Sequence, residues 1–144
     1  MPYRSIRQII EERECATAPS GTTVSEAARL MREKRVGAVL VVEEGRLTGI
    51  VTERDVLYRV VAEGRDAQAI RLAEVMTANP QTIHPDKPFP DALHMMHEGG
   101  YRHVPVVDDG RPIGIVSVRD ALGPELEDFI YEILRREQAS DILA

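Results

Sequence analysis

Two short motifs place a hydroxyl three residues before a carboxylate, at points where a predicted strand gives way to a predicted helix. They are Thr52-Glu53-Arg54-Asp55 and Ser117-Val118-Arg119-Asp120. In one interpretation each motif is a capping box: the hydroxyl accepts a hydrogen bond from the third helical N–H, and the carboxylate accepts one from the backbone of the cap residue. Capping alone accounts for both pairs, but it does not require an arginine immediately before each aspartate.

A second interpretation makes the same motifs part of a nucleotide-binding site. A helix N-terminus offers free N–H groups to a phosphate, and an aspartate one turn into the helix can accept two hydrogen bonds from a ribose diol. Gly49 and Gly114, three residues before the hydroxyls, let a ligand approach the strand. The hydroxyl or the arginine can contact the phosphate. The two interpretations are compatible, and the spacing alone does not decide between them.

Other side chains with reactive chemistry are few. His94 and His97 have the i, i+3 spacing of a helix face, but no third metal ligand lies near them in the sequence, so a solvated face is expected. His103 could act as an acid or base, yet no nucleophile with an orienting partner accompanies it, which favours a phosphate contact. The chain has neither a G-x-x-x-x-G-K-[ST] loop nor a G-x-G-x-x-G fingerprint. We therefore expect neither catalysis nor a metal site.

The two motifs belong to an internal repeat. Residues 49–55 (GIVTERD) recur 65 positions later as residues 114–120 (GIVSVRD), and further identities share that offset: Ala27/Ala92, Met31/Met96, Val39/Val104, Val41/Val106 and Gly45/Gly110. Similar units usually pack about a pseudo-twofold axis and place their equivalent loops on either side of a shared cleft. The sequence therefore predicts that function is located in such a cleft.

Each repeat is predicted to contain a helix, two strands and a second helix. In the first repeat these elements cover residues 23–35, 38–42, 47–52 and 53–62, and in the second the two strands cover 104–107 and 112–117. The strands are apolar at consecutive positions, which predicts that both faces of each sheet are covered. The connection around residues 71–76 is too short and apolar for a free tether, so the two halves should be docked.

Composition limits the remaining possibilities. The chain has 144 residues, is 43% hydrophobic and 29% charged, and has a net charge of -6, of which residues 124–144 supply -4. No apolar run approaches the roughly 20 residues that span a bilayer, and no secretory signal is evident. A membrane is therefore not expected as a partner, and without a basic stripe nucleic acid is a poor one. Cys15, the only cysteine, fits a reducing compartment and a buried apolar role.

Two terminal segments outside the repeats have apolar residues at helical spacing. Residues 3–14 carry Ile6, Ile9 and Ile10, and residues 124–138 carry Leu126, Phe129, Ile130, Ile133 and Leu134. The apolar face of the acidic C-terminal helix requires a surface to pack against. That surface is either the rest of this chain or a partner subunit.

The combined pattern resembles a tandem pair of cystathionine β-synthase (CBS) domains, the Bateman module. The resemblance covers about residues 6–122 and is carried by the G-I-V-[TS]-x-R-D endings, the strand Tyr101–Val107 (YRHVPVV) and the segment Leu72–Thr77 (LAEVMT). It implies an α/β (α+β) fold of two pseudosymmetric CBS units, each a small sheet with flanking helices, packed sheet to sheet, with additional terminal helices. The expected boundaries are 1–14 for the N-terminal helix, 15–66 and 67–122 for the units, and 123–144 for the acidic helix and tail.

The resemblance also implies adenosine-containing ligands in two clefts between the units. Asp55 and Asp120 would hold the ribose hydroxyls, and Thr52 and Ser117 would lie near the ribose or phosphate. The start of each unit and of its next strand would flank the base and phosphates, which adds Thr17, Thr82, Ile83, Val36, Gly37, Ala38, Tyr101, Arg102, His103 and Pro105 to the expected site, with Arg54 and Arg119. Since Arg102 and His103 correspond to Gly37 and Ala38, the two sites are expected to differ in affinity or ligand.

The function implied is that of a cytoplasmic, stand-alone CBS-pair sensor of an adenine nucleotide such as AMP, ADP, ATP or NAD(H). It would act as a homodimer, need no cofactor, and signal to an unidentified effector protein through a shift in the packing of its units. Two alternatives stay open. In one, the protein is a structural dimerisation module whose motifs serve only as caps; in the other, it is an enzyme that acts on a nucleotide with His103 as the base.

Overall fold

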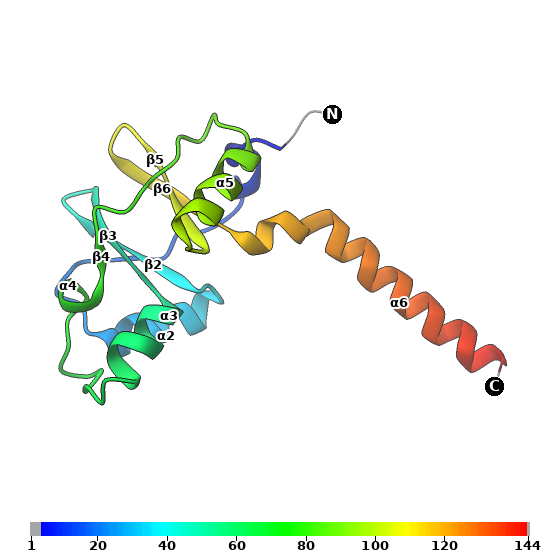
Figure 1. Ribbon diagram of the computed structural model, residues 1–144, viewed down its shortest axis with the longest axis horizontal. Coiled ribbons are helices and arrows are strands. Elements are labelled where there is room, and N and C mark those ends of the chain that lie inside the picture. The colour runs from blue at the N-terminus through cyan, green and yellow to red at the C-terminus, as the bar shows by residue number, and fades with distance from the viewer. Residues whose placement is uncertain (1–3, 144) are drawn as a thin grey trace.

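Two hairpins of matching register form the centre of the molecule in the computed structural model (Figure 1), which describes residues 4–143 apart from the side chains of 124–130 and 141–143. Strand β2 (Ala38–Glu43) pairs with β3 (Arg46–Thr52), and β5 (His103–Asp108) pairs with β6 (Arg111–Ser117). Each hairpin shifts its register at the equivalent point, between Val41 and Val42 and between Val106 and Val107. The internal repeat therefore extends to individual backbone pairs.

Short strands extend the first hairpin on both sides. Strand β1 (Thr17–Ala18) runs parallel to β2, and β4 (Thr77–Ala78) runs antiparallel to β3, which gives the order β1-β2-β3-β4. In the second half the position equivalent to β1 is a single parallel bridge between Ile83 and Val106. In both halves, therefore, the first extended segment runs parallel to the first strand of the hairpin, β2 or β5.

One long helix covers each hairpin. Helix α2 (Val24–Lys34) begins at Thr23, whose side chain and that of Glu26 form a reciprocal capping box, and it ends at Arg35 in the left-handed region with φ 54°. Helix α5 (Phe89–Gly99) follows Pro88 and ends at Gly100 with φ 71°. Proline at the start of a helix and glycine just after its end are the expected signals for its two ends.

The strands bury side chains on both faces, as their consecutive apolar residues predict. Val39, Val41 and Val51 are fully buried and pack under α2. The alternate residues Ala38, Leu40 and Ile50 face the other hairpin, where Ile115 of β6 packs against them. Helices therefore cover the outer faces, and the two sheets pack against each other through their inner faces.

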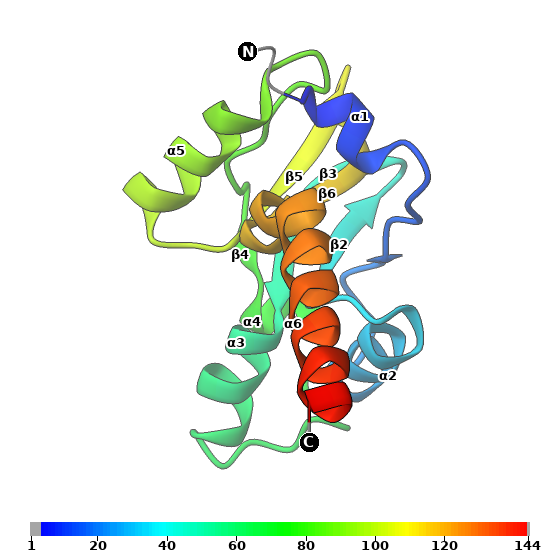
Figure 2. The same cartoon turned by 90° about the vertical axis from the view of Figure 1, so that its right-hand side faces the viewer.

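Two short helices each pack against a repeat other than the one that they precede in the sequence. Helix α1 (Ile6–Ile10) precedes the first repeat but buries its isoleucines in the core of the second, whereas α4 (Leu72–Val75) precedes the second repeat and packs in the first. Their anchoring bonds are equivalent: the N–H of Ile6 donates to the carbonyl of Lys87 at 3.0 Å, and that of Leu72 to Thr22 at 2.9 Å. Figure 2 shows α1 next to the β5–β6 hairpin.

The segments after the hairpins differ between the repeats. Helix α3 (Glu53–Val56) continues into the π-helical turn η1 (Leu57–Val61), while the 3₁₀ turn η2 (Val118–Leu122) leads into the long helix α6 (Gly123–Leu143). Helix α6 extends away from the two hairpins (Figure 1). Among residues 4–143 no helix has the length and hydrophobicity required to cross a bilayer.

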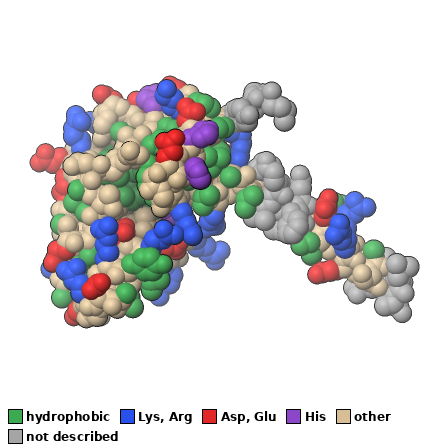
Figure 3. All heavy atoms as spheres, in the orientation of Figure 1, with side chains coloured by type: hydrophobic (Ala, Val, Ile, Leu, Met, Phe, Trp, Pro, Cys, Tyr) green, Lys and Arg blue, Asp and Glu red, His purple; other side chains and the backbone are tan. Residues whose placement is uncertain are grey.

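Apolar side chains are exposed on the elements that follow the hairpins. They are Leu57, Tyr58 and Val61 after the first motif, Val118 and Leu122 after the second, and Tyr131, Ile133 and Leu134 on α6. Figure 3 shows hydrophobic side chains gathered at the lower end of the body, where Figure 1 places α3. Three of the apolar residues predicted on the C-terminal helix, Leu126, Phe129 and Ile130, lie outside the described side chains.

Candidate ligand-binding clefts

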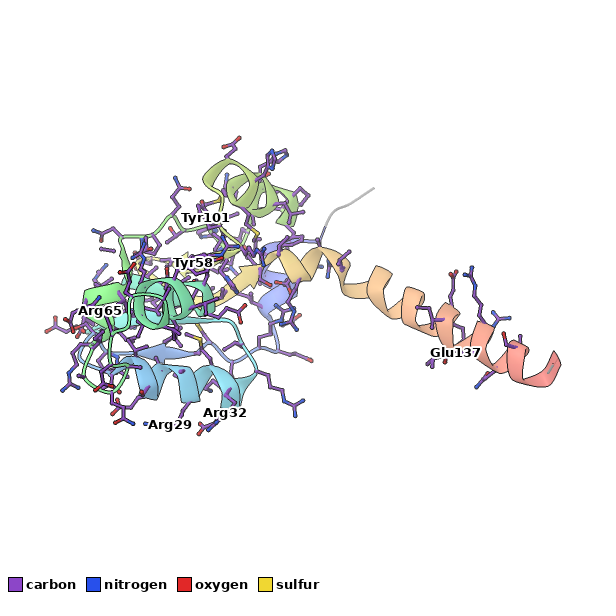
Figure 4. The ribbon with its side chains drawn as sticks, turned by 60° about the horizontal axis from the view of Figure 1, so that its bottom comes forward. Arg29, Arg32, Tyr58, Arg65, Tyr101 and Glu137 are labelled. Carbon is purple, nitrogen blue, oxygen red and sulfur yellow. The ribbon has the colours of Figure 1, made fainter. Side chains whose placement is uncertain are left out.

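The first cleft lies between the motif of the first repeat and the strand start of the second. It has a volume of about 730 Å³, within the range of small-molecule sites. Cleft 1, as we name it, is lined by Ile50, Thr52, Glu53, Arg54, Asp55, Leu57, Tyr58, Thr77, Asn79, Pro80, Gln81, Gly100, Tyr101, Arg102 and His103. Tyr58 and Tyr101 reach it from opposite repeats (Figure 4), and the Tyr101 hydroxyl donates to Oε1 of Gln81.

The second cleft has the reverse arrangement and a volume of about 500 Å³. Cleft 2 combines the motif of the second repeat with the strand start of the first. Its lining residues are Arg13, Glu14, Cys15, Ala16, Arg35, Val36, Gly37, Ala38, Glu53, Arg102, His103, Gly114, Ile115, Ser117, Val118, Arg119 and Asp120. Most residues that line cleft 1 have their repeat equivalents in the lining of cleft 2. The two clefts are therefore related by the pseudosymmetry of the chain.

Asp55 serves as a helix cap at the edge of cleft 1. Its Oδ2 accepts hydrogen bonds from the Thr52 backbone N–H at 2.8 Å and from the Thr52 hydroxyl at 3.1 Å, and its own N–H donates to that hydroxyl at 3.3 Å. The other oxygen, Oδ1, lies 3.6 Å from Nε of Arg59 one turn further along. The capping interpretation is therefore realised here, and one carboxylate oxygen has only a long contact.

Asp120 is held more tightly at the edge of cleft 2. Its Oδ2 accepts a hydrogen bond from the Ser117 N–H at 2.8 Å, and its Oδ1 lies 2.6 Å from Nη2 of Arg13. The Asp120 side chain is only 7% exposed, compared with 15% for Asp55. Both motif aspartates therefore cap their helical turns, but they differ in how much of the carboxylate remains available.

Three side chains form a wall shared by the two clefts: Glu53, Arg102 and His103. A Cβ added to Gly37 would lie 2.9 Å from Oε1 of Glu53 and 3.2 Å from Nε2 of His103, so Gly37 leaves room for this wall. Burial lowers the pKa of the His103 imidazole below its usual value, while the Glu53 carboxylate opposes that change. His103 is therefore mostly neutral at neutral pH and can exchange hydrogen bonds with a ligand in either cleft.

Cys15 lies in the wall of cleft 2 and packs against Ala38, Leu40 and Ile50. Burial raises the pKa of its thiol to about 11, although Lys34 opposes the shift. The predicted apolar role agrees with this partly buried position. At neutral pH the thiol is therefore protonated and weakly nucleophilic.

Most of the predicted site residues line the clefts. Arg54, Asp55, Tyr101, Arg102 and His103 meet in cleft 1, and Val36, Gly37, Ala38, Ser117, Arg119 and Asp120 meet in cleft 2, while Thr52 lines cleft 1. Thr17, Thr82, Ile83 and Pro105 line neither cleft. Ile83 and Pro105 are buried and bonded to each other through the backbone at 3.0 Å, because this segment pairs with β5.

Several lining residues were not singled out in the sequence. Asn79 and Gln81 lie just before the predicted Thr82, and Cys15 and Ala16 lie just before the predicted Thr17, so in each segment the residues that line a cleft directly precede the predicted one. Leu57 and Tyr58 reach cleft 1 through the π-helical turn, which spacing does not signal. His94 and His97 are exposed on α5, and within the described part of the chain no three His, Cys, Asp or Glu side chains group as metal ligands.

Comparison with known proteins gives the family of this arrangement. The family model of the CBS domain matches residues 6–62 and again residues 72–124. The chain belongs to the CBS domain family. A CBS domain-containing protein of Bacillus subtilis, YhcV, is 38% identical over 107 residues, covering 74% of this chain and 76% of that protein. The protein CBSCBSPB3 of Arabidopsis thaliana is 40% identical over the same length, but the match spans only 19% of that larger protein.

Solved structures of CBS pairs have the same fold. A protein with CBS domains from Burkholderia ambifaria superposes with a TM-score of 0.79 at 35% identity, covering 87% of this chain and 96% of that one. PAE2072 of Pyrobaculum aerophilum, solved with AMP, gives 0.75 at 27% identity over 81% and 89% of the two chains. The CBS pair of MJ0100, solved with 5′-methylthioadenosine and S-adenosyl-L-methionine, gives 0.75 at 28% identity over 88% and 99%. The predicted two-unit CBS fold is confirmed.

Proposed function

We propose that this CBS pair is a regulatory module that binds an adenine nucleotide in the clefts between its units. The observation that carries the proposal is that each cleft joins the aspartate motif of one unit to the strand start of the other. A ligand that fills such a cleft contacts both units at once. It therefore stabilises one relative arrangement of the units by its difference in affinity for the two arrangements.

Cleft 1 provides chemistry for each part of a nucleotide. The Asp55 Oδ1, whose contact with Arg59 is 3.6 Å long, can accept hydrogen bonds from a ribose diol. Tyr58, Tyr101 and Leu57 offer apolar and aromatic surface to a base, while Arg54 and Arg102 can neutralise phosphate charge. AMP, ADP, ATP and NAD(H) are the proposed ligands, and the structures solved with AMP and with methylthioadenosine support the adenosine part.

No chemistry on the ligand is part of this proposal. His103 is the only histidine that lines the described clefts, and the charged groups that act on its imidazole are Glu53, Arg102, Asp120 and Arg119. Nucleophilic catalysis would also require a serine, threonine or cysteine activated by a hydrogen bond to this imidazole. An enzyme that acts on a nucleotide would show turnover of ATP or NADH that His103→Ala abolishes. Observation of such turnover would contradict a purely regulatory role.

The structural alternative, in which the motifs serve only as caps, has support in the cap bonds at Thr52 and Ser117. The homodimer and the unidentified effector also remain proposals, supported by the exposed apolar side chains on η1, η2 and α6. A cap-only module predicts no stabilisation by any adenylate. A sensor predicts stabilisation by at least one.

A thermal-shift panel distinguishes these functions. AMP, ADP, ATP, NAD(H) and S-adenosylmethionine would be tested on wild type, on Asp55→Ala/Asp120→Ala and on Asp91→Ala, an exposed aspartate that lines neither cleft. A ligand at about 100 times its Kd adds roughly 2.7 kcal/mol to the stability of wild type and Asp91→Ala. Each lost cap costs about 1 kcal/mol with or without ligand. The double variant should lose the ligand shift altogether.

A further inference from the structure

The two motif aspartates differ in a way that the internal repeat does not predict. In cleft 2, Arg13 reaches from the N-terminal segment and places Nη2 2.6 Å from Oδ1 of Asp120. The Ser117 N–H occupies the other carboxylate oxygen. Arg4, from the same segment, donates to the Asp120 carbonyl at 2.6 Å. Asp120 is therefore bonded on both carboxylate oxygens and on its backbone.

Cleft 1 has no equivalent of these arginines. The anchoring bonds of α1 and α4 place Ile6 opposite Leu72, so Arg13 corresponds to Asn79 and Arg4 to Ile70. Asn79 lines cleft 1 but carries no charge. The partner of Asp55 is instead Arg59 on its own helical segment, at 3.6 Å, and Arg59 also donates to the Val75 carbonyl at 3.0 Å. The Asp55 carboxylate is accordingly the more available of the two.

We propose that Arg13 acts as an internal occupant of the ribose position in cleft 2, so that the resting protein binds an adenosine ligand in cleft 1 alone. The inference rests on the proposed function and specifies which cleft performs it. A carboxylate with both oxygens in charge-assisted bonds has no free geometry for a diol, and separating Arg13 from it costs affinity. The Arg13 side chain is 48% exposed, so it can leave Asp120 for solvent without moving the backbone.

Titration calorimetry of the full chain with adenosine and with AMP tests this inference. Adenosine carries the diol without a phosphate, so the loss of one positive charge in Arg13→Ala does not weaken its binding. Wild type should bind one adenosine per chain. Arg13→Ala should bind two, because the affinity of cleft 2 for the diol rises about ten- to a hundredfold once Asp120 is released.

Matched variants identify the cleft that gains the ligand. Arg7→Ala removes another exposed arginine of the same segment, paired with Asp86 at 3.0 Å and outside both clefts, and should behave as wild type. Asp55→Ala should bind no adenosine, while Arg13→Ala/Asp55→Ala should bind one, in cleft 2. If Arg13→Ala binds no more than wild type, or if wild type binds two molecules, the inference is wrong.

Failure of the proposed function gives a different result. If neither adenosine nor AMP binds wild type or any variant, the ligand-sensing role and this inference both fall. If AMP binds wild type and Arg13→Ala loses that binding, Arg13 is a phosphate ligand and the inference alone is overturned. Thermal unfolding checks the contact itself: Arg13→Ala should lower the Tm of the parent chain but leave the Tm of Asp120→Ala almost unchanged.

Discussion

Gly49 and Gly114 precede the two motifs, and the structure gives both a packing role. A Cβ on Gly114 would lie 3.0 Å from side-chain atoms of Ile10, and one on Gly49 would collide with the Met76 side chain. Ile10 and Met76 are equivalent residues at the ends of α1 and α4. The sequence suggested that these glycines let a ligand approach the strand; Gly49 lines neither cleft, although Gly114 does line cleft 2.

Gly114→Ala should therefore destabilise the protein. The added methyl group has to displace Ile10 in a filled core, which costs about 1–3 kcal/mol. Gly21→Ala is the matched control, because nothing lies within 4 Å of a Cβ at Gly21. Urea unfolding of both variants measures the difference. If Gly114→Ala costs no more than Gly21→Ala, the packing role is wrong.

His103 should make stability depend on pH. Its pKa in the folded state is lowered below 6.5, first by burial, with Glu53 and Asp120 opposing and Arg102 and Arg119 assisting the shift. The unfolded chain therefore binds a proton more readily than the folded protein. The stability that neutral His103 contributes is fully present above about pH 6.5, and it is lost as the pH falls through the lowered pKa of the folded state. His103→Gln should lose less stability than wild type between about pH 7 and about pH 5 in urea unfolding. Equal losses would contradict the assignment.

At the scale of elements, local sequence signals predict which helices and strands form, but not which part of the molecule each one packs against. Thr23 and Glu26 cap α2 as a capping box, and the β-branched run at 38–42 forms a buried strand, because both depend on neighbouring residues. The exchange of α1 and α4 between the halves could not be predicted in this way. Apolar spacing shows that Ile6 must be buried, but not in which core. The ion pair of Arg13 with Asp120 depends on that exchange.

Ile6→Ala tests the position of α1. Ile6 is fully buried in the core of the second half, so the cavity should cost about 2–5 kcal/mol. Val61→Ala, at a residue that is 62% exposed and lines neither cleft, should change stability by no more than about 0.5 kcal/mol. Chemical denaturation followed by circular dichroism gives both values. A cost for Ile6→Ala as small as that for Val61→Ala would mean that α1 does not pack there.

At the scale of the whole molecule, the pseudosymmetry assembles each cleft from both repeats. The sequence predicted Asp55, Asp120 and the strand starts, and it predicted that the two sites differ. It could not show that Asp55 shares a cleft with Tyr101 of the other repeat, or that Arg102 and His103 line both clefts. Those pairings follow from the way in which the inner faces of the two sheets pack, which no residue spacing along one chain records.

Amide chemical-shift mapping of the isotope-labelled protein during titration with AMP tests the shared cleft most directly. The account predicts that saturating AMP shifts the signals of two separated segments together, residues 52–58 of the first repeat and 100–103 of the second, with one dissociation constant. Asp55→Ala should abolish both sets of shifts. Shifts confined to one repeat, or no shifts with any adenylate, would contradict a ligand site built from both units.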